Sequence, residues 1–190
     1  MTRHFLPALL LATLLYGIAP PAAQAQSVVS PPDVRALKPG EFLWYPQIAP
    51  EGPVVLVVSL DEQRAYVYRN GIAIGVSTIS SGKAGKETPT GVFTILQKNK
   101  DHRSNLYNDA PMPYMQRLTW DGIALHGGHL PGYPASHGCV RLPQAFAEKL
   151  FAITRFGDSV VVANAKASPA SVVHPAVLAP VIAGGQAAHP

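Results

Sequence analysis

Cys139 is the only cysteine of the 190-residue chain, and its surroundings indicate chemistry rather than packing. It lies in the stretch ASHGCVRL (135–142), directly after Gly138, whereas a packing cysteine usually lies among branched aliphatic residues. Three of the seven histidines fall with it in the segment HGGHLPGYPASHGC (126–139). Reactive side chains in a glycine-rich connection are typical of an active site on a rigid scaffold. We therefore predict the functional site in this segment.

Two kinds of chemistry fit these residue types. A cysteine nucleophile needs a base such as histidine, because a free thiol is mostly protonated at neutral pH. The backbone N–H groups of residues 137–139 would then donate hydrogen bonds to the oxyanion that develops on the substrate. The alternative is a zinc site. The segment contains no Asp or Glu, however, that could serve as a general base or accept a hydrogen bond from a zinc-ligating histidine. The third interpretation is an incidental thiol among surface histidines. The possible zinc ligands are His126, His129, His137 and Cys139.

The rest of the sequence predicts a mainly β domain that positions this segment. An apolar face with helical period predicts one helix over 143–154, with Pro143 at its first position. Asn70-Gly71 is a strong signal for a hairpin turn between two strands. Short apolar or alternating runs predict strands at 54–60, 64–70, 72–81, 91–98, 122–126, 140–142 and 159–164.

Three segments lack these patterns. Two of them flank the predicted domain, which covers residues 54–164, and the third lies within it. Residues 26–53 are rich in proline, and we expect an extended lead-in whose residues 42–45 pack on the domain. Residues 99–121 are polar, and we expect a structureless loop that forms a lid or pocket wall, with Tyr114 contacting substrate. Residues 165–190 are rich in Ala and Pro and are expected to be disordered.

The first 25 residues have the pattern of a secretory signal. A basic start precedes the apolar run 5–18 and the small-x-small site Ala23-Gln24-Ala25. We expect cleavage after this site, no membrane span in the mature chain and a periplasmic or otherwise exported location, with an uncleaved anchor as the alternative. An exported chain with one cysteine keeps a free reactive thiol or pairs with another chain. The net charge of +4 comes from scattered basic residues, which argues against nucleic acid as a partner.

The motifs of this chain resemble those of the bacterial L,D-transpeptidase catalytic-domain family. His126-Gly127 followed by SHGCVR (136–141) is similar to the family's signature. The stretches SSGKAGKETPTGVFTI (80–95) and VVLVVSLDEQRAYVYRNG (54–71) resemble its second block and its opening hairpin. The resemblance implies a β-sandwich of two mixed sheets, with one main helix after the catalytic cysteine.

The resemblance also implies a peptidoglycan enzyme that needs no cofactor. Cys139 would attack the carbonyl after the third residue of a tetrapeptide stem, expel the terminal D-alanine and hold the stem as a thioester. An amine acceptor would then receive the stem, either a second stem in a 3→3 crosslink or an envelope lipoprotein or outer-membrane protein. The alternatives are an L,D-carboxypeptidase that uses water, and a non-catalytic or zinc-binding envelope protein on the same fold.

Roles for single residues follow from the same resemblance. His126 is implied as proton donor and acceptor for Cys139, and the carbonyl of Gly127 as the group that orients its ring. Gly138 corresponds to a backbone position facing the oxyanion, and no metal ligand is implied. The positions expected to contact substrate are Ser136, His137 and Arg141.

Overall fold

The computed structural model describes residues 34–106 and 108–166. The predicted signal sequence and nearly all of the predicted disordered tail lie outside this range. No helix in the described part of the chain has the length and apolarity that crossing a membrane requires.

Ten strands, one α-helix and two short 3-10 helices make up the described fold. The helices are η1 (Val34–Ala36), η2 (Pro46–Ile48) and α1 (Gln144–Ile153). The strands are β1 (Phe42–Trp44), β2 (Val54–Ser59), β3 (Arg64–Arg69), β4 (Ile72–Thr78), β5 (Gly91–Thr94), β6 (Gln97–Arg103), β7 (Pro111–Arg117), β8 (Ala124–Gly127), β9 (Val140–Leu142) and β10 (Ser159–Ala163).

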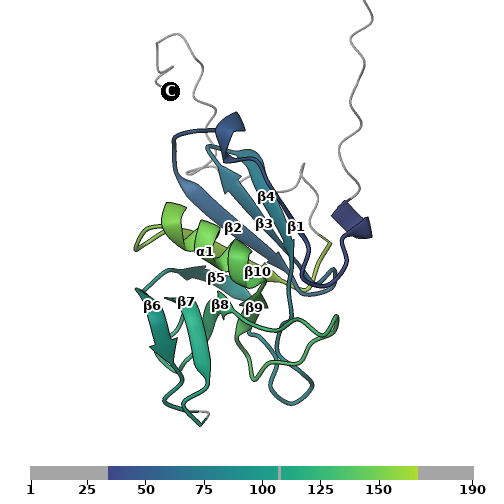
Figure 1. Cartoon of the computed structure of the whole chain (residues 1–190), viewed down its shortest axis with the longest axis vertical. Helices are drawn as coiled ribbons and strands as arrows, with labels where there is room; N and C mark the ends of the chain where they lie inside the picture. Colours follow the sequence, from purple (N-terminus) through teal and green to yellow (C-terminus); the bar gives the residue numbers. More distant parts are fainter. Residues whose placement is uncertain (1–33, 107, 167–190) are drawn as a thin grey trace, which may run out of the picture. The chain divides into compact units, whose positions relative to one another are not determined.

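The strands form two mixed sheets with α1 between them (Figure 1). The larger sheet has the order β1-β4-β3-β2-β10-β5, and the smaller has the order β6-β7-β8-β9. Each sheet contains one parallel pair, β2 with β10 and β8 with β9, and its other pairs are antiparallel. The predicted fold class, a β-sandwich of two mixed sheets with one main helix after Cys139, is confirmed.

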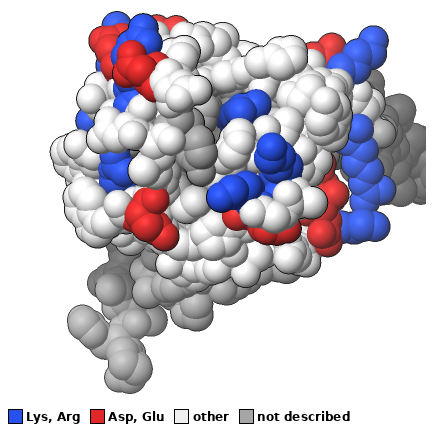
Figure 2. All heavy atoms as spheres, turned by 90° about the horizontal axis from the view of Figure 1, so that it is seen from below, with Lys and Arg blue, Asp and Glu red and all other residues white. Residues whose placement is uncertain are grey.

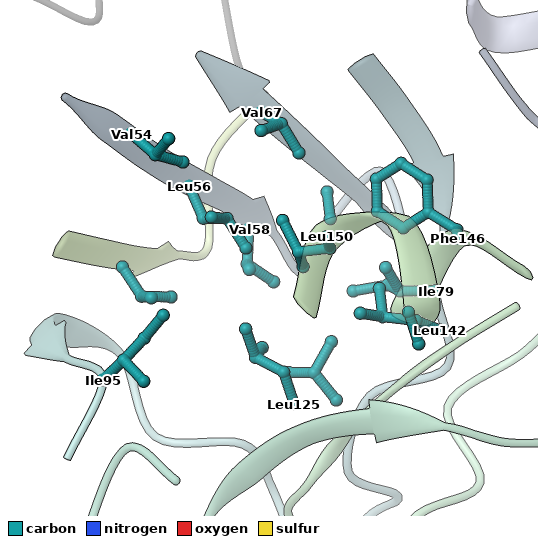
Figure 3. Close-up of a cluster of buried hydrophobic side chains, with 14 of the residues drawn as sticks. Val54, Leu56, Val58, Val67, Ile79, Ile95, Leu125, Leu142, Phe146 and Leu150 are labelled. Atoms are coloured by element: carbon teal, nitrogen blue, oxygen red, sulfur yellow. The ribbon is translucent and has the colours of Figure 1, made fainter. Parts of the chain in front are cut away.

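The main core lies where α1 meets both sheets. Phe146 and Leu150 are fully buried on the apolar face of the helix. They belong to one cluster with Leu56 and Val67 of the larger sheet and Leu125 of the smaller one, and Figure 3 shows these side chains pointing toward one another. Because the helix buries apolar surface against both sheets, it holds the two sheets together.

The lead-in contributes to this domain, as its aromatic residues predict. The rings of Phe42 and Trp44 each lie 5.4 Å from the ring of Phe146, centroid to centroid. β1 is an edge strand that pairs only with β4 in the described sheet, which suits a proline-rich segment. Tyr45, the last of the predicted packing residues, is exposed instead.

The prediction of a structureless loop over residues 99–121 is wrong. β6 and β7 form an antiparallel hairpin in which Gln97 pairs with Arg117 and Arg103 with Pro111. β6 is a polar edge strand with no fully buried residue, so it shows no alternation to recognise. Pro111 and Pro113 are tolerated because β8 pairs only with the other half of β7, at Gln116 and Arg117.

The single strand predicted over 91–98 is divided between the two sheets. β5 ends at Thr94, and β6 begins at Gln97 in the smaller sheet. Ile95, at the crossing, is buried in the main core. The helix starts at Gln144, one residue later than predicted, with Pro143 as its N-cap.

Lys98 of β6 binds the C-terminal end of α1. Its ammonium group donates hydrogen bonds to the carbonyls of Phe151 and Thr154, both at 2.6 Å, and lies 4.2 Å from the centre of the Phe151 ring. A cation at a helix C-terminus satisfies carbonyls that have no partner within the helix and interacts favourably with the helix dipole. This contact fixes the hairpin to the helix.

Replacing Lys98 with Met should therefore destabilise the fold. Loss of two charge-assisted hydrogen bonds should lower the free energy of unfolding by about 1–3 kcal/mol, measured by urea denaturation. Lys100→Met is the matched control, because Lys100 lies on the same strand but is exposed; its change should stay within about 0.5 kcal/mol. Equal effects of the two substitutions would contradict the assigned role of Lys98.

Candidate active site

The parallel pairing of β8 and β9 brings the predicted reactive residues to one face of the smaller sheet. Leu125 lies opposite Val140 and His126 opposite Arg141. Leu125 and Val140 are buried in the main core. Side chains alternate along a strand, so His126 and Arg141 face the other side, and Cys139, one residue before β9, faces the same side as they do.

His126 is buried and held by a backbone hydrogen bond. Its side chain is 7% exposed, and its Nδ1–H donates to the carbonyl of Gly127 at 2.8 Å. Because a carbonyl can only accept, this bond assigns the proton to Nδ1 and leaves Nε2 as an acceptor. Burial lowers the pKa of His126 to about 4, although the bond to Gly127 acts in the opposite direction. The imidazole is therefore neutral at pH 7.

The Cys139 thiol is also kept neutral. Its sulfur lies 3.4 Å from the carbonyl of Gly122, to which the S–H donates, and packs against Met112, Met115 and Ala124. Burial raises the pKa of Cys139, while the backbone N–H of Ala124 favours the thiolate. The resting pair consists of a thiol and a neutral imidazole, and not of a thiolate and an imidazolium.

The turn that presents Cys139 requires glycine at position 138. Gly138 has a φ of +113°, and a Cβ there would lie 2.8 Å from Cδ1 of Ile123. The Ser136 hydroxyl donates to the Cys139 carbonyl and accepts the N–H of Gly138 at 3.2 Å. The Gly138 N–H, predicted to face an oxyanion, is thus directed at Ser136.

The segment 80–83 holds this turn from the other side. The carbonyl of Ser81 accepts the N–H groups of Ala135 and Ser136, both at 3.0 Å. Ser80 and Arg141 exchange two backbone hydrogen bonds, also at 3.0 Å. The second sequence block therefore has a physical role, because its first residues bind the backbone on both sides of Cys139.

A cavity of about 730 Å³ opens over the thiol and the imidazole. Its walls come from the hairpin, the β8–β9 connection and the residues before β8. Of the residues predicted from the sequence, those that line it are His126, Gly127, His129, Ser136, His137, Cys139 and Arg141. It is the size of a pocket for a small ligand or an extended peptide segment.

The comparison with protein families agrees with this geometry. Residues 53–162 match the YkuD family, described as the L,D-transpeptidase catalytic domain. The chain belongs to this family. The match covers more than half of the sequence and includes every element that lines the cavity.

Solved L,D-transpeptidases share the fold. The chain is 29% identical to one from Stackebrandtia nassauensis, with a TM-score of 0.55, covering 60% of this chain and 56% of that one. For one from Mycobacterium tuberculosis H37Rv the values are 26%, 0.55, 58% and 57%. For LdtMt1 in complex with imipenem they are 25%, 0.54, 58% and 58%. The chain thus spans less than two thirds of each of these structures. No curated protein matches it.

Tyr114 lies outside the cavity although substrate contact was predicted for it. Its ring packs edge-on against Phe151 of α1, with centroids 5.8 Å apart, and a hydrogen bond to Glu148 raises its pKa. The neighbouring Met112 and Pro113 line the cavity instead. A positive φ of 56° at Tyr114 interrupts the alternation of β7, so counting from the sequence could not show which side chain faces the site.

Gly122, whose carbonyl accepts the Cys139 thiol, is not among the site residues predicted from the sequence. The available signal was Asp121-Gly122, a turn dipeptide at the start of the strand predicted over 122–126. In the described residues, no three His, Cys, Asp or Glu side chains gather closely enough to hold a metal ion. On the face seen in Figure 2, Lys and Arg lie in small separate groups rather than in a continuous stripe.

The depressed pKa of His126 predicts a stability that depends on pH. The folded state has a pKa of about 4 and the unfolded chain about 6.5, so the unfolded state binds the proton more readily. This contribution is fully present above pH 6.5 and is lost as the pH falls toward 4. Between pH 7 and pH 4 the free energy of unfolding should drop by about 3 kcal/mol more in the wild type than in His126→Gln.

Urea denaturation at several pH values measures this difference. The comparison with His126→Gln removes the contribution of carboxylates, which titrate in both proteins. Parallel curves for the two proteins would show that His126 is not held neutral by the fold.

Proposed function

We propose that this chain is an L,D-transpeptidase that uses Cys139 as nucleophile and His126 as general base. One observation carries the proposal. The thiol and an imidazole whose Nδ1–H is fixed by Gly127 line the same cavity, on one face of a parallel strand pair. A fixed Nδ1–H leaves Nε2 to take the thiol proton, as cysteine–histidine catalysis requires.

In the first half-reaction, the stem peptide acylates the enzyme. The Cys139 proton moves to Nε2 of His126 as the sulfur attacks the carbonyl after the third residue of a tetrapeptide stem. The tetrahedral intermediate then breaks its C–N bond, and His126 returns the proton to the leaving amine of D-alanine. Since both groups start neutral, the proton moves during the attack, and no stable ion pair precedes it.

In the second half-reaction, an amine receives the stem. The acceptor amine attacks the thioester carbonyl and gives a proton to His126, and the C–S bond breaks. The thiolate regains a proton from His126, which restores the starting pair. The acceptor is a second stem, giving a 3→3 crosslink, or an amine of an envelope protein; water in its place would make the enzyme an L,D-carboxypeptidase.

Arg141 and the turn residues bind the substrate in this proposal. The charge of Arg141 favours both a neutral His126 and a Cys139 thiolate, so it supports the nucleophile electrostatically. Its half-buried side chain lines the cavity, where a guanidinium can bind a carboxylate of the stem. Ser136 fixes the turn, and the exposed His137 forms part of the cavity wall.

The family is typically exported, and we place the activity in the cell envelope, where stem peptides occur. The sequence pattern of a secretory signal at residues 1–25 supports this location. The proposed reaction requires no cofactor and involves no nucleic acid.

Mass spectrometry of the intact protein tests the proposal. Incubated with imipenem, which the similar LdtMt1 structure contains, the wild type should gain the mass of one acyl adduct, and Cys139→Ala should gain none. With a disaccharide tetrapeptide, chromatography should show loss of D-alanine and a crosslinked dimer. A tripeptide product alone would assign the carboxypeptidase. Absence of any adduct, or loss of activity in EDTA that zinc restores, would reject the cysteine mechanism.

Two histidine variants test which imidazole is the base. His126→Ala should slow acylation by imipenem about 100-fold at neutral pH, and higher pH should partly restore the rate because hydroxide then generates the thiolate. His137→Ala should lose less and show little recovery with pH, since its exposed side chain belongs to the wall. Stopped-flow absorbance of the β-lactam gives both rates. A larger, pH-dependent defect in His137→Ala would transfer the role of base to His137.

A further inference from the structure

A second cavity, of about 250 Å³, adjoins the first on the side of the hairpin. Gly122, whose carbonyl accepts the Cys139 thiol, lines both cavities. Met115 and Ala124, which belong to the cluster against which Cys139 packs, line the second one. The second cavity therefore adjoins the first one, on the far side of the residues that they share. The other residues common to both cavities are Ser104, Leu106, Met112 and Asp121.

An exposed aromatic side chain borders this second cavity. Trp120 is 73% exposed, and Leu106, which also lines the cavity, is 66% exposed. Single exposed apolar side chains are common on protein surfaces, but two of them beside the same cavity, one an indole, are typical of a ligand-binding surface. The turn that carries Trp120 is fixed, because Thr119 accepts hydrogen bonds from Gly122 and Ile123. The indole is thus presented from an ordered backbone.

The polar lining of this cavity combines one cation with one anion. Arg117 donates from Nε to the side chain of Gln97 and has its remaining N–H groups for other acceptors. Asp121 supplies the carboxylate, and Asn105 supplies an amide. His102 stays neutral, because burial and then the charge of Arg117 lower its pKa. Opposite charges that balance in this way favour a neutral polar ligand over an ammonium group or a carboxylate.

A flat apolar platform with donors and acceptors around its edge matches a pyranose ring. The C–H face of a sugar packs on an indole, while its hydroxyl and acetamido groups bond with amide, carboxylate and guanidinium groups. The cavity is smaller than pockets for drug-sized ligands, which suits a single ring. A three-residue stem spans about 10 Å when extended. A stem whose reacting carbonyl lies at the thiol can therefore place the sugar at its other end in the adjoining cavity.

We propose that this second cavity is a saccharide subsite, with Trp120 as its stacking platform. It binds a neutral N-acetylhexosamine unit of the glycan strand that carries a stem peptide. The inference rests on the proposed function for the identity of the glycan, and it assigns the enzyme a preference for glycan-linked stems over free ones.

Saccharide binding is measured apart from turnover, on the full chain with Cys139→Ala. In an NMR titration with the β-1,4-linked tetramer of N-acetylglucosamine, the Trp120 indole N–H signal should shift and saturate. Adding Trp120→Ala should weaken binding about tenfold or more, as expected for loss of an aromatic platform. Tyr133→Ala is the matched control, because Tyr133 is 61% exposed but lines neither cavity; it should bind like its parent.

Kinetics with the active enzyme supply the second measurement. Trp120→Ala should raise KM for a glycan-linked tetrapeptide and abolish its advantage over the free tetrapeptide. Absence of saturable saccharide binding, or equal binding by Trp120→Ala, would overturn the proposal. An equal loss for glycan-linked and free stems would also overturn it, since the indole would then contact peptide. Imipenem acylation of the wild type reports on the proposed function separately, so the two can fail independently.

Discussion

The parallel pairing of β8 with β9 is the constraint on which the candidate site depends. It places His126 beside Arg141 and brings Cys139 to the same face of the sheet, while the alternate side chains enter the core. Parallel neighbours cannot be joined by a tight turn, so residues 128–139 must leave the sheet and return. The long glycine-rich connection is a consequence of this topology. The same connection forms a wall of the cavity. This one strand pairing therefore determines both the positions of the thiol and the imidazole and the space above them.

Burial then determines the electrostatics of the reactive pair. Both His126 and Cys139 are more stable uncharged in this environment. The hydrogen bond to Gly127 opposes the effect of burial at His126, and the backbone N–H of Ala124 with the charges of Arg141 and Arg117 opposes it at Cys139. A neutral thiol resists oxidation better than a thiolate does. In the proposed mechanism, reactivity therefore depends on geometry, because the thiol proton must reach Nε2 of His126 when a substrate carbonyl arrives.

Much of this arrangement could be predicted from the sequence, because local patterns encode it. β2 and β10 are valine-rich, and the histidines and the cysteine stand in one glycine-rich segment. The β6–β7 hairpin could not be predicted, since β6 is polar on both faces and its stability comes from pairing and from the contact of Lys98 with α1. The Gly122 carbonyl and the orientation of Tyr114 depend on backbone conformation, which residue types do not specify.

The position of β10 has a consequence for how the chain acquires this structure. β10 is the last strand of the described fold, yet it lies inside the larger sheet, parallel to β2 and antiparallel to β5. Until it arrives, β2 lacks one neighbour, and β5 lacks its only strand partner in that sheet. Contacts between such distant segments are slow to form, because closing the chain costs entropy before any pairing compensates. The larger sheet can therefore be completed only after β10 has been synthesised, and a chain that stops before Ser159 exposes two unpaired strand edges prone to aggregation.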